Sequence, residues 1–297
     1  MKVGIIILNW NGWKDTQECL KSLVQITYSD FFVTVIDNGS DNNEAQRIIS
    51  EFGKFARVIS LPKNLGYARG NNFGIQHSLK EGAEAVLLLN NDVVADKNFL
   101  NFLVNKLKED RVGIVGPKIL YYHEKNRIWY GGGTFHWWTG LAFHYGEGKL
   151  DSPAYNKTRE VSFITGCSML IKKEVFEKIG YLDEEYQLYW EDADFCYRTF
   201  KKCFSLWYVP ESRIWHKVSR TIGEGSPKRS YLVTKSRILF MKKHLSKLQW
   251  LIFATLFTFY KIPLKIFHCL HKGRIENLKA FFIGIKDGLI NSDQKFK

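Results

Sequence analysis

The stretches V-I-D-N-G-S-D, residues 35–41, and L-L-L-N-N-D-V, residues 87–93, decide how this chain folds. Each is a short apolar run that leads directly into polar side chains, as a buried strand does where it ends. Amphipathic segments separate these strands from their neighbours, so strands and helices alternate through residues 1–110. That alternation predicts an α/β fold with a mostly parallel central sheet and helices on both faces.

The same alternation extends outward from these two stretches. The expected strands are residues 3–8, 32–36, 57–61, 85–89 and 163–171, and the expected helices are residues 16–24, 41–52, 71–80, 99–108, 173–179 and 189–201. The Gly-rich aromatic residues 131–148 predict loop and hairpin structure. We therefore expect three parts: a ligand-binding half at 1–110, a second half of the same domain at 111–230, and a basic helical extension at 231–297.

Two carboxylates fall just after strands, where parallel sheets bind their ligands. They are Asp37 and Asp92. An aspartate at such a point often caps a turn, and for either residue alone that structural role is an equal alternative. Together at one sheet edge they favour a base or ribose contact for Asp37 and a cation for Asp92. With Asn90 beside it, Asp92 offers oxygen ligands that suit Mg²⁺ or Mn²⁺.

A Gly-rich segment, N-L-G-Y-A-R-G-N-N-F-G, lies at residues 64–74. Its three glycines permit close backbone approach to a ligand, and Arg69 supplies a fixed cation for phosphate or base oxygens. Such a segment is ordinarily only a loop. Here it opens a helix between two strand ends that already carry carboxylates, which favours ligand binding.

Three acidic residues begin the segment Y-W-E-D-A-D-F at residues 189–195. Stabilisation of the helix dipole explains one of Glu191, Asp192 and Asp194, but not all three beside aromatic residues. A carboxylate that is partly desolvated by aromatics and repelled by other carboxylates has a raised proton affinity, which suits a general base. His216 follows a strand-like segment and leads into a polar loop at 217–230. Most lone histidines are structural, but this one precedes a loop suited to closing over phosphates.

In this order, the motifs resemble glycosyltransferase family 2, and most closely its rhamnosyltransferase-type branch. The resemblance covers roughly residues 3–245 and also includes I-L-N-W-N-G, T-G-C-S-M-L-I-K-K-E-V-F-E-K-I-G-Y-L-D-E and I-W-H-K-V-S-R-T. It implies a GT-A fold, a nucleotide diphosphate sugar donor, a divalent metal (Mg²⁺ or Mn²⁺) and inversion at the anomeric carbon. The first half then binds the donor and the second half the acceptor. The branch implies dTDP-rhamnose as donor and a hydroxyl of a glycan or lipid-linked acceptor in cell-surface polysaccharide synthesis.

The resemblance also assigns roles to particular residues. It implies that Asp192 is the catalytic base, with Glu191 in support. Asp92 takes the last position of the family's Asp-x-Asp motif, which reads Asn90-Asn91-Asp92 here and so leaves one acidic metal ligand. His216 matches a position that helps to hold the metal or the diphosphate. The residues expected to bind the nucleotide sugar are Asn9, Asp37, Asn38, Arg69 and Asn91.

Two other enzyme classes use a similar sheet. A dinucleotide-dependent oxidoreductase needs G-x-G-x-x-G directly after the first strand, where this chain has Asn9-Trp10-Asn11-Gly12. A sugar nucleotidyltransferase needs a phosphate loop rich in Gly, Arg and Lys at the same place. The sequence therefore favours neither class.

Positive charge is concentrated at the end of the chain: residues 201–297 carry 20 Lys and Arg but 5 Asp and Glu. A basic membrane- or nucleic-acid-binding protein without transferase activity is the alternative function. Because the basic residues are interleaved with apolar runs, a membrane surface is the better fit. The chain contains no Cys-x-x-Cys pair and no secretory leader, which favours a cytoplasmic protein.

We expect amphipathic helices in this tail to hold the enzyme on the inner face of the cell membrane. Trp250–Tyr260 runs without charge but is too short to cross a bilayer, and Pro263 is expected to break or restart the helix. A basic stripe is expected from Lys261, Lys265, His268 and Lys272, and an apolar stripe from Leu278, Phe281, Phe282, Ile285 and Leu289. The alternative is that these helices pack against the catalytic domain or in a homodimer.

Overall fold

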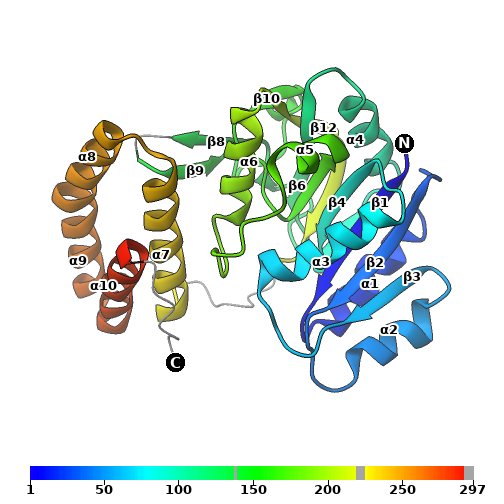
Figure 1. Cartoon of the computed structure of the whole chain (residues 1–297), viewed down its shortest axis with the longest axis horizontal. Coiled ribbons are helices and arrows are strands. Elements are labelled where there is room, and N and C mark those ends of the chain that lie inside the picture. The colour runs from blue at the N-terminus through cyan, green and yellow to red at the C-terminus, as the bar shows by residue number, and fades with distance from the viewer. Residues whose placement is uncertain (137–138, 219–224, 291–297) are drawn as a thin grey trace. The chain divides into compact units, whose positions relative to one another are not determined.

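The computed structural model describes residues 1–136, 139–218 and 225–290 (Figure 1). The chain forms two compact units. The first unit comprises Met1–Thr134, Phe143–Glu184 and Glu191–Ser219, and the second comprises Phe135–Ala142, Glu185–Trp190 and the chain from Arg220 onward. The loop expected at 217–230 lies in part, at 219–224, outside the described residues.

The first unit is built on one sheet. Its strands are β1 (Val3–Asn9), β2 (Phe31–Asp37), β3 (Ala56–Ser60), β4 (Ala85–Asn90), β5 (Val93–Ala95), β6 (Val112–Tyr121), β7 (Ile128–Tyr130), β10 (Arg159–Val161), β11 (Ser168–Lys172) and β12 (Ser205–His216). Its helices are α1 (Trp13–Leu23), α2 (Glu44–Phe52), α3 (Tyr67–Lys80), α4 (Phe99–Leu107), α5 (Lys173–Ile179) and α6 (Glu191–Lys201), with a short 3₁₀ turn, η1 (Pro153–Tyr155). A separate hairpin joins β8 (Gly133–His136) to β9 (Leu141–His144).

The strand order of the sheet is β10-β12-β6-β11-β4-β1-β2-β3 (Figure 1). Strands β3, β2, β1 and β4 are parallel neighbours, whereas β11 runs antiparallel to both β4 and β6. The register pairs Asn9 with Asp37 and Leu8 with Asn90. The polar ends of three strands therefore meet at one edge, and the predicted α/β fold with a mostly parallel sheet is confirmed.

Helix α3 lies against β1 at two glycine positions. A Cβ atom at Gly70 would lie 2.6 Å from a methyl carbon of Leu8, and one at Gly74 would lie 2.5 Å from Ile6. These glycines therefore allow the helix to pack closely on the sheet. The expectation that they open space for a ligand was wrong for both, because the neighbouring atoms belong to the protein core.

Several boundaries in the first unit differ from the sequence prediction: α1, α2 and α3 begin at Trp13, Glu44 and Tyr67 and not at 16, 41 and 71, and two further differences have a visible cause. The strand expected at 163–171 begins only at Ser168, because Thr165 starts a turn whose carbonyl accepts a hydrogen bond from the Ser168 amide. The helix expected from residue 189 begins at Glu191. Tyr189 and Trp190 have φ angles of 67° and 77°, a left-handed conformation that an α-helix cannot include.

The second unit is mainly helical. Its helices are α7 (Pro227–His244), α8 (Lys247–Leu256), the π-helical segment η2 (Phe257–Lys261), α9 (Ile262–His271) and α10 (Ile275–Ile290), and α7 packs along α10 (Figure 1). A buried cluster of Tyr231, Leu232 and Ala280 joins α7 to α10.

Helices α8, η2 and α9 form one continuous helix, Lys247–His271. Pro263 was expected to break or restart the helix: it does not break it, but the α-helical pattern restarts at Ile262, with Pro263 in the first turn of α9. Proline removes one hydrogen bond and displaces the carbonyl four residues earlier, at Phe259, and the π-helical turn accommodates that displacement. Within the described residues, this helix is the one that is long and apolar enough to cross a membrane. The run Trp250–Tyr260, expected to be too short to cross a bilayer, is thus part of a longer helix that meets this test.

Candidate active site

Asn9 and Asp37 meet where β1 and β2 end. Asn9 is fully buried, and its amide donates to Asp37 Oδ1 at 2.9 Å. The same amide lies 3.0 Å from Glu44 Oε2, and the Thr16 hydroxyl donates to Asn9 Oδ1 at 2.7 Å. Asn9 therefore fixes the carboxylate of Asp37. Sequence reasoning missed Glu44, whose one signal was its place in the first turn of α2.

Asn38 ties the Gly-rich segment to the end of β2. Its side-chain carbonyl accepts from the Leu65 amide at 2.9 Å, and its own amide donates to Asn64 Oδ1 at 3.1 Å. The turn that follows β2 requires glycine at position 39. Gly39 has a φ of +71°, and a Cβ atom there would lie 2.4 Å from the Lys63 backbone. Asn38 thus shapes the loop that borders Asp37.

Asn91 and Arg69 occupy different surroundings. The Asn91 amide donates to Thr16 Oγ1 at 3.0 Å, which ties the end of β4 to α1. Arg69 lies on α3 and its Nε donates to Glu184 Oε2 at 2.7 Å, while Asn72 donates to the other oxygen of Glu184 at 3.0 Å. About half of the Arg69 side chain is exposed. Its cation is therefore engaged by a carboxylate that the sequence did not indicate.

Asp92 and His216 form a buried pair. Strand β5 pairs antiparallel with β12, and the register places Val93 opposite His216. As a result His216 Nε2 lies 3.1 Å from Asp92 Oδ1, and both side chains are 7 % exposed. The two residues that the sequence proposed as metal ligands are therefore brought together.

The surroundings of His216 hold its ring in place. Trp129 packs edge-on against the imidazole with ring centroids 4.6 Å apart. Burial disfavours the charged imidazolium, but the neighbouring Cys167 sulfur and Asp92 carboxylate outweigh it and raise the pKa of His216. Its Nδ1 atom is buried without a hydrogen-bond partner among the described residues. Sequence reasoning missed both Trp129, for which no element was predicted, and Cys167, which lies in a segment predicted as a strand.

Asp192 stands at the start of α6 and is held by backbone amides. The Gly166 N–H donates to Asp192 Oδ2 at 2.9 Å, and the Ala193 N–H donates to Oδ1 at 2.8 Å. Burial raises the pKa of Asp192, while these two hydrogen bonds act in the opposite direction. The carboxylate is thus fixed in position and has an increased affinity for a proton.

Of the two neighbouring carboxyls, Glu191 has the pKa that its surroundings raise more strongly. Burial, followed by the charges of Asp192 and Asp194, raises the pKa of Glu191 well above its usual range. Its Oε2 atom is buried without a hydrogen-bond partner among the described residues. Burial of this kind favours the neutral form of the carboxyl, so Glu191 is less suited than Asp192 to act as a base.

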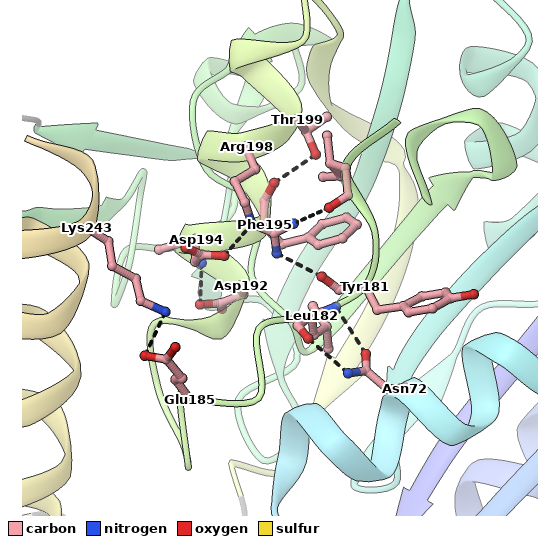
Figure 2. A network of polar contacts seen from close by, with 12 residues as sticks. Asn72, Tyr181, Leu182, Glu185, Asp192, Asp194, Phe195, Arg198, Thr199 and Lys243 are labelled. Carbon is pink, nitrogen blue, oxygen red and sulfur yellow. Dashed lines mark hydrogen bonds and ion pairs between the residues drawn. The ribbon is translucent and has the colours of Figure 1, made fainter. Parts of the chain in front are cut away.

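Asp194 has a separate, structural role (Figure 2). Its Oδ2 accepts from Arg198 Nε at 2.6 Å, and the other Arg198 nitrogens donate to the carbonyls of Ile179 and Tyr181. Nearby, Asn72 holds Leu182 through both its side-chain oxygen and its amide. Of the three acidic residues, Asp194 is therefore the one that anchors the helix.

Trp129 and His144, which we call the aromatic wall, lie between the Asp92–His216 pair and Asp192 within the first unit. Trp129 contacts His144 with ring centroids 5.0 Å apart, in addition to its contact with His216. His144 stacks on Phe163, and its ring lies within electrostatic range of Asp192. Burial lowers the pKa of His144, so this ring is neutral at physiological pH. His144 comes from the region expected to be loop and hairpin, whereas Trp129 lies just before it in β7, and nothing in their spacing singled them out.

A model of glycosyl transferase family 2 matches residues 4–180, which is more than half of the chain. The chain belongs to this family. It is 26 % identical over 302 residues to the low-salt glycan biosynthesis hexosyltransferase Agl10 of Haloferax volcanii, with 99 % of this chain and 92 % of that one covered. It is 23 % identical over 280 residues to the dTDP-rhamnosyl transferase RfbF of Shigella flexneri, with 90 % and 89 % covered.

The fold is also that of solved glycosyltransferase structures. A mannosyltransferase from Pyrobaculum calidifontis, solved with GDP-Man and Mn²⁺, aligns with a TM-score of 0.61 and 12 % identity, covering 98 % of this chain and 88 % of that one. The protein is thus a GT-A glycosyltransferase, as the sequence motifs predicted. Its membership of the family also disfavours the alternative of a basic binding protein without transferase activity.

Proposed function

We propose that this glycosyltransferase is inverting and metal-dependent, and that it transfers a sugar from a nucleotide diphosphate donor to a lipid-linked glycan in cell-surface polysaccharide synthesis. The observation that carries the proposal is the wall of Trp129 and His144. This wall joins the Asp92–His216 pair to Asp192 within one unit. Direct displacement at the anomeric carbon needs a base, here Asp192, and a site for the leaving diphosphate, here Asp92 and His216, within reach of one bound sugar.

The donor set of Asp92 and His216 fits a divalent ion. A carboxylate oxygen and an imidazole nitrogen are both donors that divalent metals accept, and Asp92 Oδ1 and His216 Nε2 lie beside each other. No group of three His, Cys, Asp or Glu side chains suited to a metal occurs among the described residues. Two protein ligands leave positions for the oxygens of a bound diphosphate, as in many phosphate-binding sites. When bound, the ion offsets the charge that develops on the departing diphosphate.

Asp92 and His216 would hold this ion through Oδ1 and Nε2, which requires His216 to give up the proton it shares with Asp92. Asp37, fixed by Asn9, is placed to accept hydrogen bonds from the nucleoside, with Asn38 and Asn91 shaping the edge around it. Arg69 is assigned to the donor side on the sequence motif alone, because its side chain here pairs with Glu184.

Asp192 would accept the proton of the attacking acceptor hydroxyl. The hydroxyl oxygen forms a bond to the anomeric carbon as the bond from that carbon to the phosphate oxygen breaks. The bonding electron pair leaves with the nucleotide diphosphate, and the hydroxyl proton ends on Asp192. Attack opposite to the leaving group inverts the anomeric configuration. The Gly166 N–H holds the carboxylate in position, and burial favours the neutral form of Glu191 beside it.

dTDP-rhamnose is the first donor to test, because the relative from Shigella flexneri is named as a dTDP-rhamnosyl transferase. The exposed apolar helix Lys247–His271 and the basic C-terminal region support attachment to the cytoplasmic face of a membrane that carries the acceptor.

A panel of nucleotide sugars tests the proposal. Each is incubated with the protein, with and without Mn²⁺, and donor hydrolysis and transfer to a lipid-linked sugar are measured. The configuration of the product's new anomeric carbon is read by NMR. We expect metal-dependent turnover of one donor with inversion. Retention of configuration, or equal turnover in excess EDTA, would contradict the mechanism.

A further inference from the structure

The second unit contains a cavity whose charged lining, in the part of the chain that the structure describes, is cationic. Its volume is about 320 Å³, at the lower end of the ~300–1,000 Å³ typical of small-molecule sites. The lining residues from the described chain that can carry positive charge are Arg229, Arg237, Lys261, Lys265, His268 and Arg274, and no described Asp or Glu is among the lining residues. We call this cavity the cationic pocket.

Arg237 lines the cationic pocket, is buried, and forms no ion pair with any carboxylate among the described residues. Its side chain is 8 % exposed, and its guanidinium lies over the rings of Phe253 and Phe257 at 5.6 and 5.2 Å. One nitrogen donates to the carbonyl of Thr139, but Nε is buried with no hydrogen-bond partner among the described residues. Burying an arginine in this way is costly unless a ligand completes its hydrogen bonds.

The neighbouring cations are likewise uncompensated. Burial, and then the charges of Arg237 and Lys265, lower the pKa of Lys261. Among the described residues, none of the five Lys and Arg side chains of the cationic pocket forms an ion pair with a carboxylate. A cluster of like charges around a buried, unsatisfied guanidinium fits a ligand with more than one negative charge.

The helix that supplies Lys261 and Lys265 has an apolar outer face. The π-helical turn η2 places Phe257 and Lys261 on the cationic pocket, whereas Phe259 and Tyr260 are 79 % and 70 % exposed. The large apolar residues of this helix that are also exposed are Leu248, Leu251, Leu256, Leu264, Phe267 and Leu270. An apolar face of this extent along a helix with cations on its other side is typical of a helix seated at a membrane surface.

We infer that the cationic pocket binds the diphosphate group of a polyprenyl-type lipid, held at the membrane by the apolar face of helix Lys247–His271. The pocket would recognise the diphosphate group, which carries two negative charges. An ordinary phospholipid such as phosphatidylglycerol carries only one. That this lipid carries the acceptor sugar rests on the proposed function, whereas the binding itself does not. The pocket would then select lipid-linked acceptors by their phosphate groups, independently of the sugar.

Vesicle binding by the full-length protein tests this inference. Phosphatidylcholine vesicles contain either a polyprenyl diphosphate or phosphatidylglycerol, at equal total negative charge. We expect tighter binding to the diphosphate vesicles. The double substitution Lys261→Gln and Lys265→Gln should weaken that binding by on the order of tenfold to thirtyfold. Lys272→Gln removes a cation just beyond the same helix but outside the pocket, and should bind as wild type does.

Several results would overturn the inference. Equal binding to both vesicle types, or an equal loss in Lys272→Gln, would reduce the effect to general surface charge. Full competition by soluble pyrophosphate with no preference for the lipid would assign the pocket to a free diphosphate. Donor hydrolysis is measured on the same samples. If hydrolysis persists while the lipid preference is absent, the inference fails alone; if the preference is present without hydrolysis or transfer of any donor, the proposed function fails alone.

Discussion

The Nε2 atom of His216 lies 3.1 Å from Oδ1 of Asp92, and both side chains are buried where β5 pairs with β12. Neither residue alone makes a metal site. Their contact depends on a short antiparallel pairing between segments far apart in the chain, so loss of either residue should have similar consequences for metal binding.

Replacing either member of this pair should abolish activation by metal. We expect Asp92→Asn and His216→Ala each to lower Mn²⁺-dependent turnover by on the order of 10²-fold or more, because the leaving diphosphate loses its charge stabilisation. The measurement is a Mn²⁺ titration of EDTA-treated protein. Asp110→Asn, which removes an exposed carboxylate, is the control. An unchanged Mn²⁺ midpoint in both variants would remove these residues from the metal site.

Replacing the proposed base should separate chemistry from donor binding. Asp192→Asn keeps the size of the side chain and its neighbours, but the amide cannot accept the proton. We expect kcat to fall by about 10²–10⁴-fold while the donor Kd stays close to wild type. Glu191→Gln should retain most turnover, since burial already favours the neutral form of Glu191. Reversed behaviour of the two variants would exchange their roles.

The buried carboxyl of Glu191 should make stability depend on pH. Burial, Asp192 and Asp194 raise its pKa in the folded state, whereas an unfolded Glu titrates near ~4.3. The folded state therefore binds a proton that the unfolded state releases, so stability is greatest below that value and falls as pH rises through the raised pKa. Urea unfolding from pH 4 to pH 8 measures this slope. It should flatten in Glu191→Gln and persist in Glu160→Gln, an exposed control.

Alanine in place of Gly70 or Gly74 should destabilise the first unit. On an exposed helix that change would gain about 1 kcal/mol. Here the new methyl group would lie 2.5–2.6 Å from side chains of β1, and overpacking of this kind costs about 1–3 kcal/mol. Chemical denaturation gives the difference. Gln76→Ala, on the exposed side of the same helix, should be neutral or stabilising.

The exposed aromatic residues of helix Lys247–His271 should control membrane attachment. Phe259→Gln with Phe267→Gln removes two side chains that are 79 % and 69 % exposed. We expect flotation with anionic vesicles to fall severalfold, because each loses apolar area that enters the lipid interface. Phe200→Gln removes an aromatic that is 52 % exposed on α6 and should leave flotation unchanged. Equal flotation of all three proteins would favour packing of this helix in an oligomer.

Local sequence patterns predicted the sheet because the strand ends and intervening helices of residues 1–110 each carry their own signal. Asp37, Asp92, Asp192 and His216 stood out for the same reason, as polar residues at element ends. The rest depended on contacts between distant segments. The pairing of Asp92 with His216, the Gly166 amide that holds Asp192, and Trp129 between two histidines are all set by tertiary packing.

The helix Lys247–His271 shows why proline was misleading. Proline in a helix clashes with the carbonyl four residues earlier, so a break is expected wherever that carbonyl cannot move aside. The π-helical turn at Phe257–Lys261 supplies the movement within the helix. The glycines of α3 were predicted to let a ligand approach the backbone closely. A group does approach closely, but it is strand β1 of the protein's own sheet.

The chain passes between the two units five times, at residues 134–135, 142–143, 184–185, 190–191 and 219–220. No single cut therefore yields either unit intact. A truncation after residue 219 keeps Phe135–Ala142 and Glu185–Trp190, whose packing partners it removes. Chimaeras that exchange acceptor preference between relatives should accordingly graft both short segments together with the C-terminal helices. Chimaeras that exchange only the chain from residue 220 onward would pair it with short segments from a different protein, to which its packing is not matched.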